Sequence, residues 1–247
     1  MKGWLLVLTV PVVALLIAGG IGWAIGNSQA GDSGSPAAST TASANPVDPH
    51  VAAGAHNFVQ FACSACHGAL GKGDVSADVP ALTTIGKTLT SAQLRTIIDK
   101  GVGVVSDPKK PFMPAWGPLL SERQVNDLVS YLHAGLPAVA DATPVPVPAG
   151  QGDVVAGSAL YVRYGCVNCH GPNGLGGVPN PASPDKTIPP LSGADFRGEF
   201  NTDAKIAEFI VSGSVLGKAP LASMPHWGGI LPPAEVSQIV AYINTLR

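Results

Sequence analysis

Charged side chains are scarce in this chain of 247 residues, at 12% of the sequence. Lysine and arginine number 14 and aspartate and glutamate number 16, so the formal net charge is −2. A protein that binds nucleic acid needs lysine and arginine gathered on one surface, because contacts with phosphates supply most of the affinity. The low basic content offers no such surface, and we exclude nucleic acid as a partner.

Aromatic residues are also few, at 6%, and no stretch alternates apolar and polar residues as a half-buried strand would. Glycine and proline are abundant, with 30 and 23 copies. Apolar residues recur at helical spacing in short segments, which predicts an all-α protein with long loops. Small helical domains of this kind bury little surface, and they usually need a metal, a staple or another filler.

A long uncharged run lies near the N-terminus. Residues 4–25 carry no charge and are numerous enough to span a bilayer as a helix. Because Lys2 is the only charge before this run, the positive-inside bias places the N-terminus in the cytoplasm and the rest outside. We predict a single-pass anchor in the cytoplasmic membrane, with the remainder on the extracytoplasmic side. A cleavable signal peptide is the alternative, with small residues at 27–30 as its cleavage region.

Two segments with few large apolar residues divide the rest of the chain. Residues 26–49 are mostly Gly, Ser, Ala, Thr and Pro, which predicts a flexible tether. Residues 134–150 are rich in proline, which favours an extended linker. We therefore expect five parts: an anchor or signal at 1–25, the tether at 26–49, a first domain at 50–133, the linker at 134–150 and a second domain at 151–247.

The two domains are repeats of one another. A shift of 103 residues places Cys63, Cys66 and His67 on Cys166, Cys169 and His170. A shift of 111 places Met113 and Trp116 on Met224 and Trp227, so the second domain has eight extra residues between its histidine and its methionine. We expect most of them in the Gly/Pro-rich loop that follows the second histidine, because surface loops tolerate insertions. Helices are predicted at 51–62, 91–102 and 121–135, and at 152–165, 202–213 and 232–247.

All four cysteines of the chain lie in two copies of Cys-x-x-Cys-His. This is the attachment motif of a c-type haem, in which two thiols add to the vinyl groups of one porphyrin and the histidine coordinates iron. A disulfide, a redox-active dithiol and half of a zinc site are the alternatives. The first two do not explain the histidine in both copies, and a zinc site would need both copies in one place. We predict two covalently bound haem c groups, with His67 and His170 as proximal ligands to iron.

The methionines are scarce and placed alike. Apart from Met1 there are only Met113 and Met224, one at the same place in each domain. A thioether on the far side of the iron stabilises its reduced state, so we predict these two residues as the sixth ligands. The alternative is that they fill gaps in a core. His226 is a rival ligand in the second domain, but it aligns with Ala115 and so does not repeat.

With these motifs the chain resembles the class I c-type cytochromes, in their tandem two-domain dihaem form, over essentially everything after the tether. The resemblance implies His/Met ligation at both irons. It implies a proline carbonyl bonded to each proximal histidine, for which we name Pro80 and Pro190, with Pro189 as the alternative to Pro190. We also assign Trp116 and Trp227 to the haem-binding sites.

The resemblance further implies that an N-terminal helix with a glycine and an aromatic residue crosses the C-terminal helix and its aromatic residue. The candidates are Gly54 and Phe58 with Tyr131, and Gly157 and Tyr161 with Tyr242.

Two irons with both axial positions filled leave no place for a substrate. We therefore expect an electron carrier rather than an enzyme, which relays electrons from a respiratory donor to an oxidase or reductase. The expected partners are a quinol–cytochrome c reductase, a terminal oxidase or a dehydrogenase. The alternatives are a fixed cytochrome subunit of a larger reductase or dehydrogenase complex, and a dihaem peroxidase, which would need one iron without its distal ligand.

Overall fold

The computed structural model describes residues 47–102, 112–181, 183–213 and 223–246. In these residues the regular structure is helical, and β pairing is limited to isolated bridges between Val102 and Met113 and between Pro179 and Thr187. The all-α prediction is confirmed for this part of the chain. Among the described helices, none combines the length and the hydrophobicity that a membrane crossing needs. The predicted anchor at residues 1–25 lies outside the described residues.

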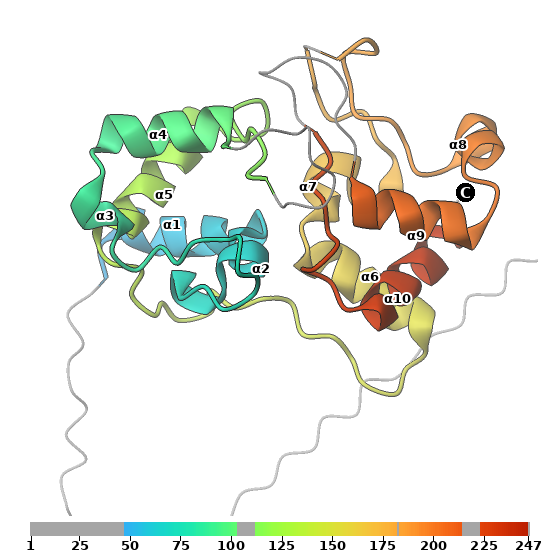
Figure 1. Cartoon of the computed structure of the whole chain (residues 1–247), viewed down its shortest axis with the longest axis horizontal. Coiled ribbons are helices and arrows are strands. Elements are labelled where there is room, and N and C mark those ends of the chain that lie inside the picture. Colours follow the sequence, from blue (N-terminus) through green and yellow to red (C-terminus); the bar gives the residue numbers. More distant parts are fainter. Residues whose placement is uncertain (1–46, 103–111, 182, 214–222, 247) are drawn as a thin grey trace, which may run out of the picture. The chain divides into compact units, whose positions relative to one another are not determined.

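The helices of the two predicted domains follow the same order (Figure 1). The first domain contains α1 (Pro49–Gln60), α2 (Cys63–His67), the 3₁₀ turn η1 (Ala69–Gly71), α3 (Ile85–Thr88), α4 (Ser91–Lys100) and α5 (Glu122–His133). The second contains α6 (Asp153–Arg163), α7 (Cys166–His170), the 3₁₀ turn η2 (Pro172–Gly174), α8 (Gly193–Glu199), α9 (Asp203–Ser212) and α10 (Pro233–Ile243).

Local signals in the sequence set where these helices begin and end. At the start of α5 the Ser121 hydroxyl accepts a hydrogen bond from the backbone N–H of Gln124. The Gln124 side-chain oxygen accepts one from the backbone N–H of Ser121, which completes the capping box that the sequence predicts. Thr90 and Gln93 form the same capping box at the start of α4. That helix ends at Gly101, whose φ of +69° is one that glycine adopts without strain.

The first and last helices of each domain cross at a glycine. A Cβ atom at Gly54 of α1 would clash with the backbone carbonyl of Asp127 in α5. A Cβ atom at Gly157 of α6 would clash in the same way with the carbonyl of Gln238 in α10. Only glycine allows the two backbones of each pair to approach this closely, so the crossing that the resemblance implies is present in both domains.

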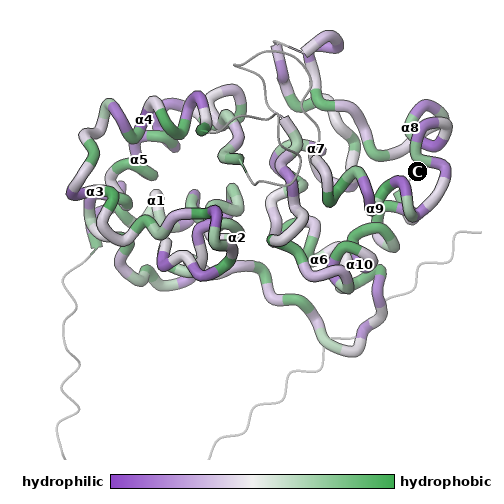
Figure 2. Tube along the Cα trace, viewed as in Figure 1, coloured by the Kyte–Doolittle hydropathy of each residue, from purple (hydrophilic) through white to green (hydrophobic). Residues whose placement is uncertain are grey.

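Aromatic pairs accompany each crossing. The rings of Phe58 and Tyr131 are 5.7 Å apart in an edge-to-face arrangement, and those of Tyr161 and Tyr242 are 5.3 Å apart. Tyr131 and Tyr161 are buried, at 2% and 1% exposure. Along α4 and α8 hydrophobic residues are interspersed with strongly hydrophilic ones (Figure 2).

The extra residues of the second domain fall mainly in one loop, as expected. The N–H of Leu82 donates to the carbonyl of Gly71, and the N–H of Leu191 donates to that of Gly174. The shift between the domains thus grows from 103 at the glycines to 109 at the leucines, which places six of the eight residues between them. Within that loop the backbone N–H of Gly177 donates to the carbonyl of Ile188, and the N–H of Ile188 donates to the carbonyl of Val178. The added segment therefore folds back on itself.

A further interaction joins the start of α1 to α5. His50 Nδ1 lies 2.7 Å from the Oδ1 atom of Asp127, whose side chain is buried. The hydrogen bond with Asp127 is the largest cause that raises the pKa of His50, followed by the charge of Asp127. The Asp48 carboxylate also raises this pKa, and Arg123 lowers it. Because the pKa in the folded state exceeds that of the unfolded chain, protonated His50 stabilises the fold.

We predict that His50→Gln destabilises the first domain in a pH-dependent way. The contribution of His50 is fully present below a pH of about 6.5, its ordinary pKa, and disappears as the pH rises through the raised pKa of the folded state. The difference in unfolding free energy between wild type and variant should therefore be larger at about pH 5.5 than at about pH 8.5. A difference that stays constant over this range in denaturant titrations contradicts the assignment.

Candidate haem-binding sites

The two Cys-x-x-Cys-His motifs adopt the same local structure. Each forms a short helix, α2 or α7, that starts at the first cysteine and ends at the histidine. The residue before each helix is in the left-handed region, with φ of 56° at Ala62 and 69° at Gly165, and this turns the chain sharply out of the preceding helix. A glycine with φ near 75° follows each histidine, at Gly68 and Gly171. Both sets of haem-attaching residues are therefore presented on one compact turn.

A backbone carbonyl orients each predicted proximal histidine. His67 Nδ1 lies 2.9 Å from the Pro80 carbonyl oxygen, and His170 Nδ1 lies 3.3 Å from that of Pro189. Since a carbonyl can only accept, Nδ1 carries the proton and Nε2 is left as the free lone pair that binds a metal.

The carbonyl beside His170 corrects the first choice of proline. Of the two candidates, Pro190 does not take this role, because the carbonyl within reach of His170 belongs to Pro189. Pro190 instead lines the cavity described below. The reason is that the two domains differ by 109 residues at this point in the chain, which aligns Pro80 with Pro189. The haem motifs and the methionines alone do not show where the shift between the domains changes.

Burial controls the protonation of these side chains. It lowers the pKa of His67 and His170, against a smaller opposing effect of the proline carbonyls, and so favours the neutral imidazole that coordinates metals. Burial raises the pKa of Cys63 to about 12 and that of Cys66 to about 11. A redox-active dithiol needs a lowered thiol pKa, so this environment opposes that alternative.

The second domain contains a cavity of about 720 Å³ with the residues expected of a haem pocket. Cys166, His170 and Met224 all line it. The rest of its wall is predominantly apolar and includes Trp227 and Ile239. Its volume lies within the range of pockets that enclose a cofactor, about 300–1,000 Å³. A haem that is attached through a cysteine and flanked by an imidazole and a thioether matches these residues.

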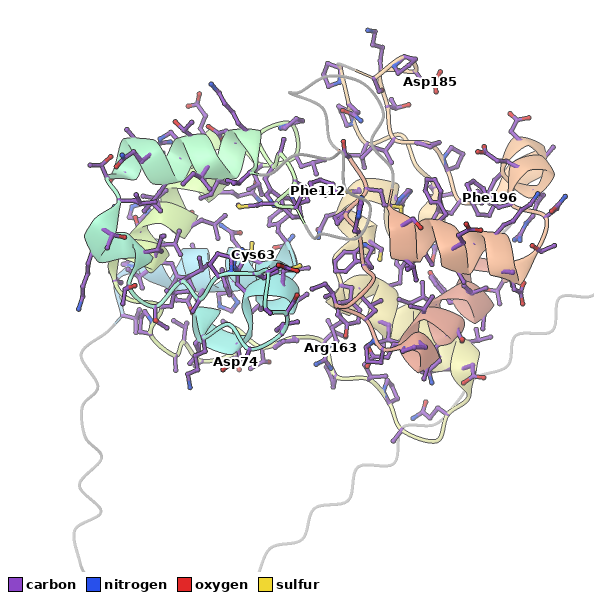
Figure 3. All side chains as sticks on the ribbon, viewed as in Figure 1. Cys63, Asp74, Phe112, Arg163, Asp185 and Phe196 are labelled. Atoms are coloured by element: carbon purple, nitrogen blue, oxygen red, sulfur yellow. The ribbon has the colours of Figure 1, made fainter. Side chains whose placement is uncertain are left out.

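The first domain brings the equivalent residues together. Cys63, Met113 and Trp116 all pack against its buried core, and Figure 3 shows Cys63 on the inner side of α2. Met113 exchanges two backbone hydrogen bonds with Val102, of 2.9 and 3.0 Å, which fix the methionine beside the end of α4. Trp116 donates its backbone N–H to the carbonyl of Ile98. Met113 is thus held by backbone hydrogen bonds and packs against the same core as Cys63.

The repeated tryptophans occupy matching places. The Trp227 N–H donates to Ile210, as the Trp116 N–H donates to Ile98. Each indole meets the aromatic ring of the residue two positions before the motif. Phe61 lies 6.2 Å from Trp116 and Tyr164 lies 5.7 Å from Trp227, between ring centroids.

His226, the rival ligand, is placed differently from Met224. It is buried, at 6% exposure, but the residues that form the wall of the described cavity include Met224 and not His226.

One wall of the second cavity has no counterpart among the predicted elements. Phe196 of α8 and Phe200, the residue that follows this helix, line it. Their spacing of four residues, about one helical turn, was the available signal. Phe196 lies between α8 and α9 in Figure 3. A short helix rich in glycine and charge gives too weak a pattern to be recognised without its neighbours.

These features together define a protein with two sites for covalently attached haem. Comparison with known families agrees over both domains. Residues 49–132 match the family described as cytochrome c oxidase, cbb3-type, subunit III, and residues 154–247 match the family described as cytochrome c. The chain therefore carries two cytochrome c domains in tandem, and it binds two haem c groups covalently.

Individual relatives cover only part of the chain or of their own length. A thiosulfate dehydrogenase electron acceptor from Thiomonas intermedia is 32% identical over 123 residues, which are 46% of this chain and 51% of that protein. The cbb3-type cytochrome c oxidase subunit FixP from Azorhizobium caulinodans is 28% identical over 199 residues, which are 78% of this chain and 59% of that protein. The chain thus spans between half and three fifths of the length of these curated relatives.

Among solved structures, the c-type cytochrome XoxG from Methylobacterium extorquens AM1 is 28% identical and covers 36% of this chain and 52% of its own. Its TM-score of 0.30 is too low to support a structural argument.

We predict that replacing Cys63 and Cys66 by serine removes one haem from the chain and leaves the other. The reason is that each motif attaches its own porphyrin through its two thiols. The alkaline pyridine spectrum of purified protein should report half the haem per chain of the wild type. The matched variant, with Cys166 and Cys169 replaced, should also retain half. Wild-type haem content in either variant would contradict the assignment of these cysteines.

Proposed function

We propose that this protein transfers electrons between redox proteins by reversible reduction of its two haems. The observation that carries the proposal is that His170 and Met224 line one cavity together with Cys166. If a histidine and a methionine occupy both axial positions of the iron, a substrate has no coordination site. Such a centre is suited to outer-sphere electron transfer and not to chemistry on a bound molecule.

Met113 and Met224 are the sixth ligands in this proposal, and His67 and His170 are the fifth. Bound haem supplies the one-electron change at iron, and the chain supplies a fixed environment for it. The hydrogen bonds that His67 and His170 donate to the carbonyls of Pro80 and Pro189 hold each imidazole in one orientation. The apolar wall around Trp227 keeps water away, and a thioether ligand with a dry pocket raises the reduction potential.

The proposed partners are redox proteins outside the cytoplasm. Two relatives bear on this: one is named as the electron acceptor of thiosulfate dehydrogenase and the other as a subunit of a cbb3-type oxidase. By analogy, a dehydrogenase or a quinol–cytochrome c reductase would deliver electrons and a terminal oxidase would receive them. The uncharged run at residues 4–25 supports a single-pass membrane anchor, with the haem domains on the extracytoplasmic side.

A fixed subunit of an oxidase is the second candidate. It is favoured by the oxidase subunit from Azorhizobium caulinodans, whose similarity extends over 78% of this chain. A dihaem peroxidase would need one iron with an open position, and the repeated Met113 and Met224 argue against it.

We expect Met113→Ala and Met224→Ala each to open one iron. The open ferrous haem should bind carbon monoxide readily and have a lower reduction potential, because a thioether favours the reduced state. The double variant should lose the ferric charge-transfer band that Met-ligated haem gives. His226→Ala is the matched control, since it changes a neighbour of Met224 and should preserve the band. Survival of the band in the double variant would refute methionine ligation.

Purification from detergent-solubilised membranes should separate a mobile carrier from a fixed subunit. A carrier has only small, short-lived interfaces with its partners, so the tagged chain should be recovered alone. Stoichiometric recovery of oxidase or dehydrogenase subunits would instead establish the second candidate.

A further inference from the structure

The α8 wall of the second cavity depends on contacts from outside its own helix. Three aromatic rings contact one another in series at this wall. The ring centroids of Phe196 and Phe200 are 5.0 Å apart, and those of Phe200 and Phe209 are also 5.0 Å apart. The helix has seven residues and no side-chain hydrogen bond at its N-terminal cap. A helix this short is not stable by itself in water. Contacts with other parts of the domain must therefore hold Phe196 and Phe200, the aromatic wall of the cavity, in place.

Arg197 makes these contacts. Its Nη1 atom donates to Asn244 Oδ1 at 3.0 Å, and its Nη2 atom donates to the backbone carbonyls of Ile243 and Leu246 at 3.2 and 3.1 Å. A third carbonyl, that of Asn244, lies 3.4 Å from Nη2. These carbonyls are at the C-terminal end of α10, where they have no partner within the helix and where the helix dipole is negative. The guanidinium thus joins α8 to α10 with charge-assisted bonds.

The same junction reaches α9. The side-chain amide of Asn244 donates to Asp203 Oδ1, at the first residue of α9, over 2.8 Å. Three helices that line the cavity therefore meet at one polar junction. Phe196 comes from α8, Phe209 from α9 and Ile243 from α10. Figure 1 shows the three helices together in the second domain.

The first domain makes the corresponding junction with different chemistry. His133, the last residue of α5, has its Nδ1 atom 2.7 Å from the carbonyl oxygen of Gly86 in α3. Its Nε2 atom lies 3.0 Å from the Ser91 hydroxyl at the start of α4. Helices α3, α4 and α5 are thus tied together as α8, α9 and α10 are. Two unrelated side chains achieve the same connection, which indicates that the connection matters beyond a single favourable contact.

We propose that Arg197 is a positioning residue that keeps the aromatic wall closed over the second haem and thereby sets the reduction potential of that haem alone. The inference rests on the proposed function only in requiring a redox-active haem in the second domain. With the junction intact, Phe196 and Phe200 exclude water from the pocket. Without it the wall opens more often, water stabilises the ferric charge, and the potential falls. Loss of a charge-assisted junction increases the open population by about tenfold or more.

The test uses the full chain with both haems in Arg197→Gln, Arg197→Lys and the control Arg123→Gln, which alters an exposed arginine of α5. Spectroelectrochemistry measures both potentials. In Arg197→Gln we expect one potential to fall and the other to keep its wild-type value. His133→Gln should shift the other potential, and the double variant should show both shifts, because distant sites add.

The result that overturns the proposal is an Arg197→Gln protein with two haems whose two potentials equal those of Arg123→Gln. If Arg197→Gln fails to retain its second haem, the potentials of Arg197→Lys test the proposal instead. Lysine keeps the positive charge but lacks the planar guanidinium that donates several hydrogen bonds at once. An intermediate fall in one potential supports the junction, and wild-type values refute it. These outcomes are independent of the methionine substitutions, so failure of the junction can be told apart from failure of the ligand assignment.

Discussion

The structure of both domains depends on one requirement: short helices must surround an apolar plate that their own side chains do not replace. In the second domain the helices enclose a cavity of about 720 Å³ that Cys166, His170 and Met224 all line. Each cytochrome c domain attaches its haem through two cysteines of one helical turn. The crossings at Gly54 and Gly157 bring the first and last helices of each domain into close contact.

The parts of this account that a sequence pattern could predict are those fixed by local spacing. The two haem motifs, the repeated methionines and the capping box at Ser121 follow from residues a few positions apart or from the repeat itself, and the resemblance to class I c-type cytochromes adds the crossings at the glycines. The choice of Pro189 over Pro190 and the wall of α8 could not be predicted, because they depend on how an insertion is distributed. The contacts of Arg197 go to backbone carbonyls some 46 residues further along the chain, which leave no trace in side-chain identity.

The two domains share their haem-attaching turn but differ in what surrounds it. In the first domain His133 joins α3, α4 and α5, and in the second Arg197 and Asn244 join α8, α9 and α10. The longer loop of the second domain folds back on itself through backbone bonds between residues 177 and 188. A duplicated domain has in this way acquired two distinct environments for the same cofactor, which is the condition for two different reduction potentials on one chain.

The central claim is that haem completes the core of each domain, and the helical content of the chain with and without attached haem tests it most directly. Far-ultraviolet circular dichroism should be compared for the haem-loaded protein and for the same chain produced without haem attachment. The account predicts that the haem-free chain loses most of its helical signal and its cooperative thermal transition. A haem-free chain with the helical signal and the transition of the loaded protein would contradict it.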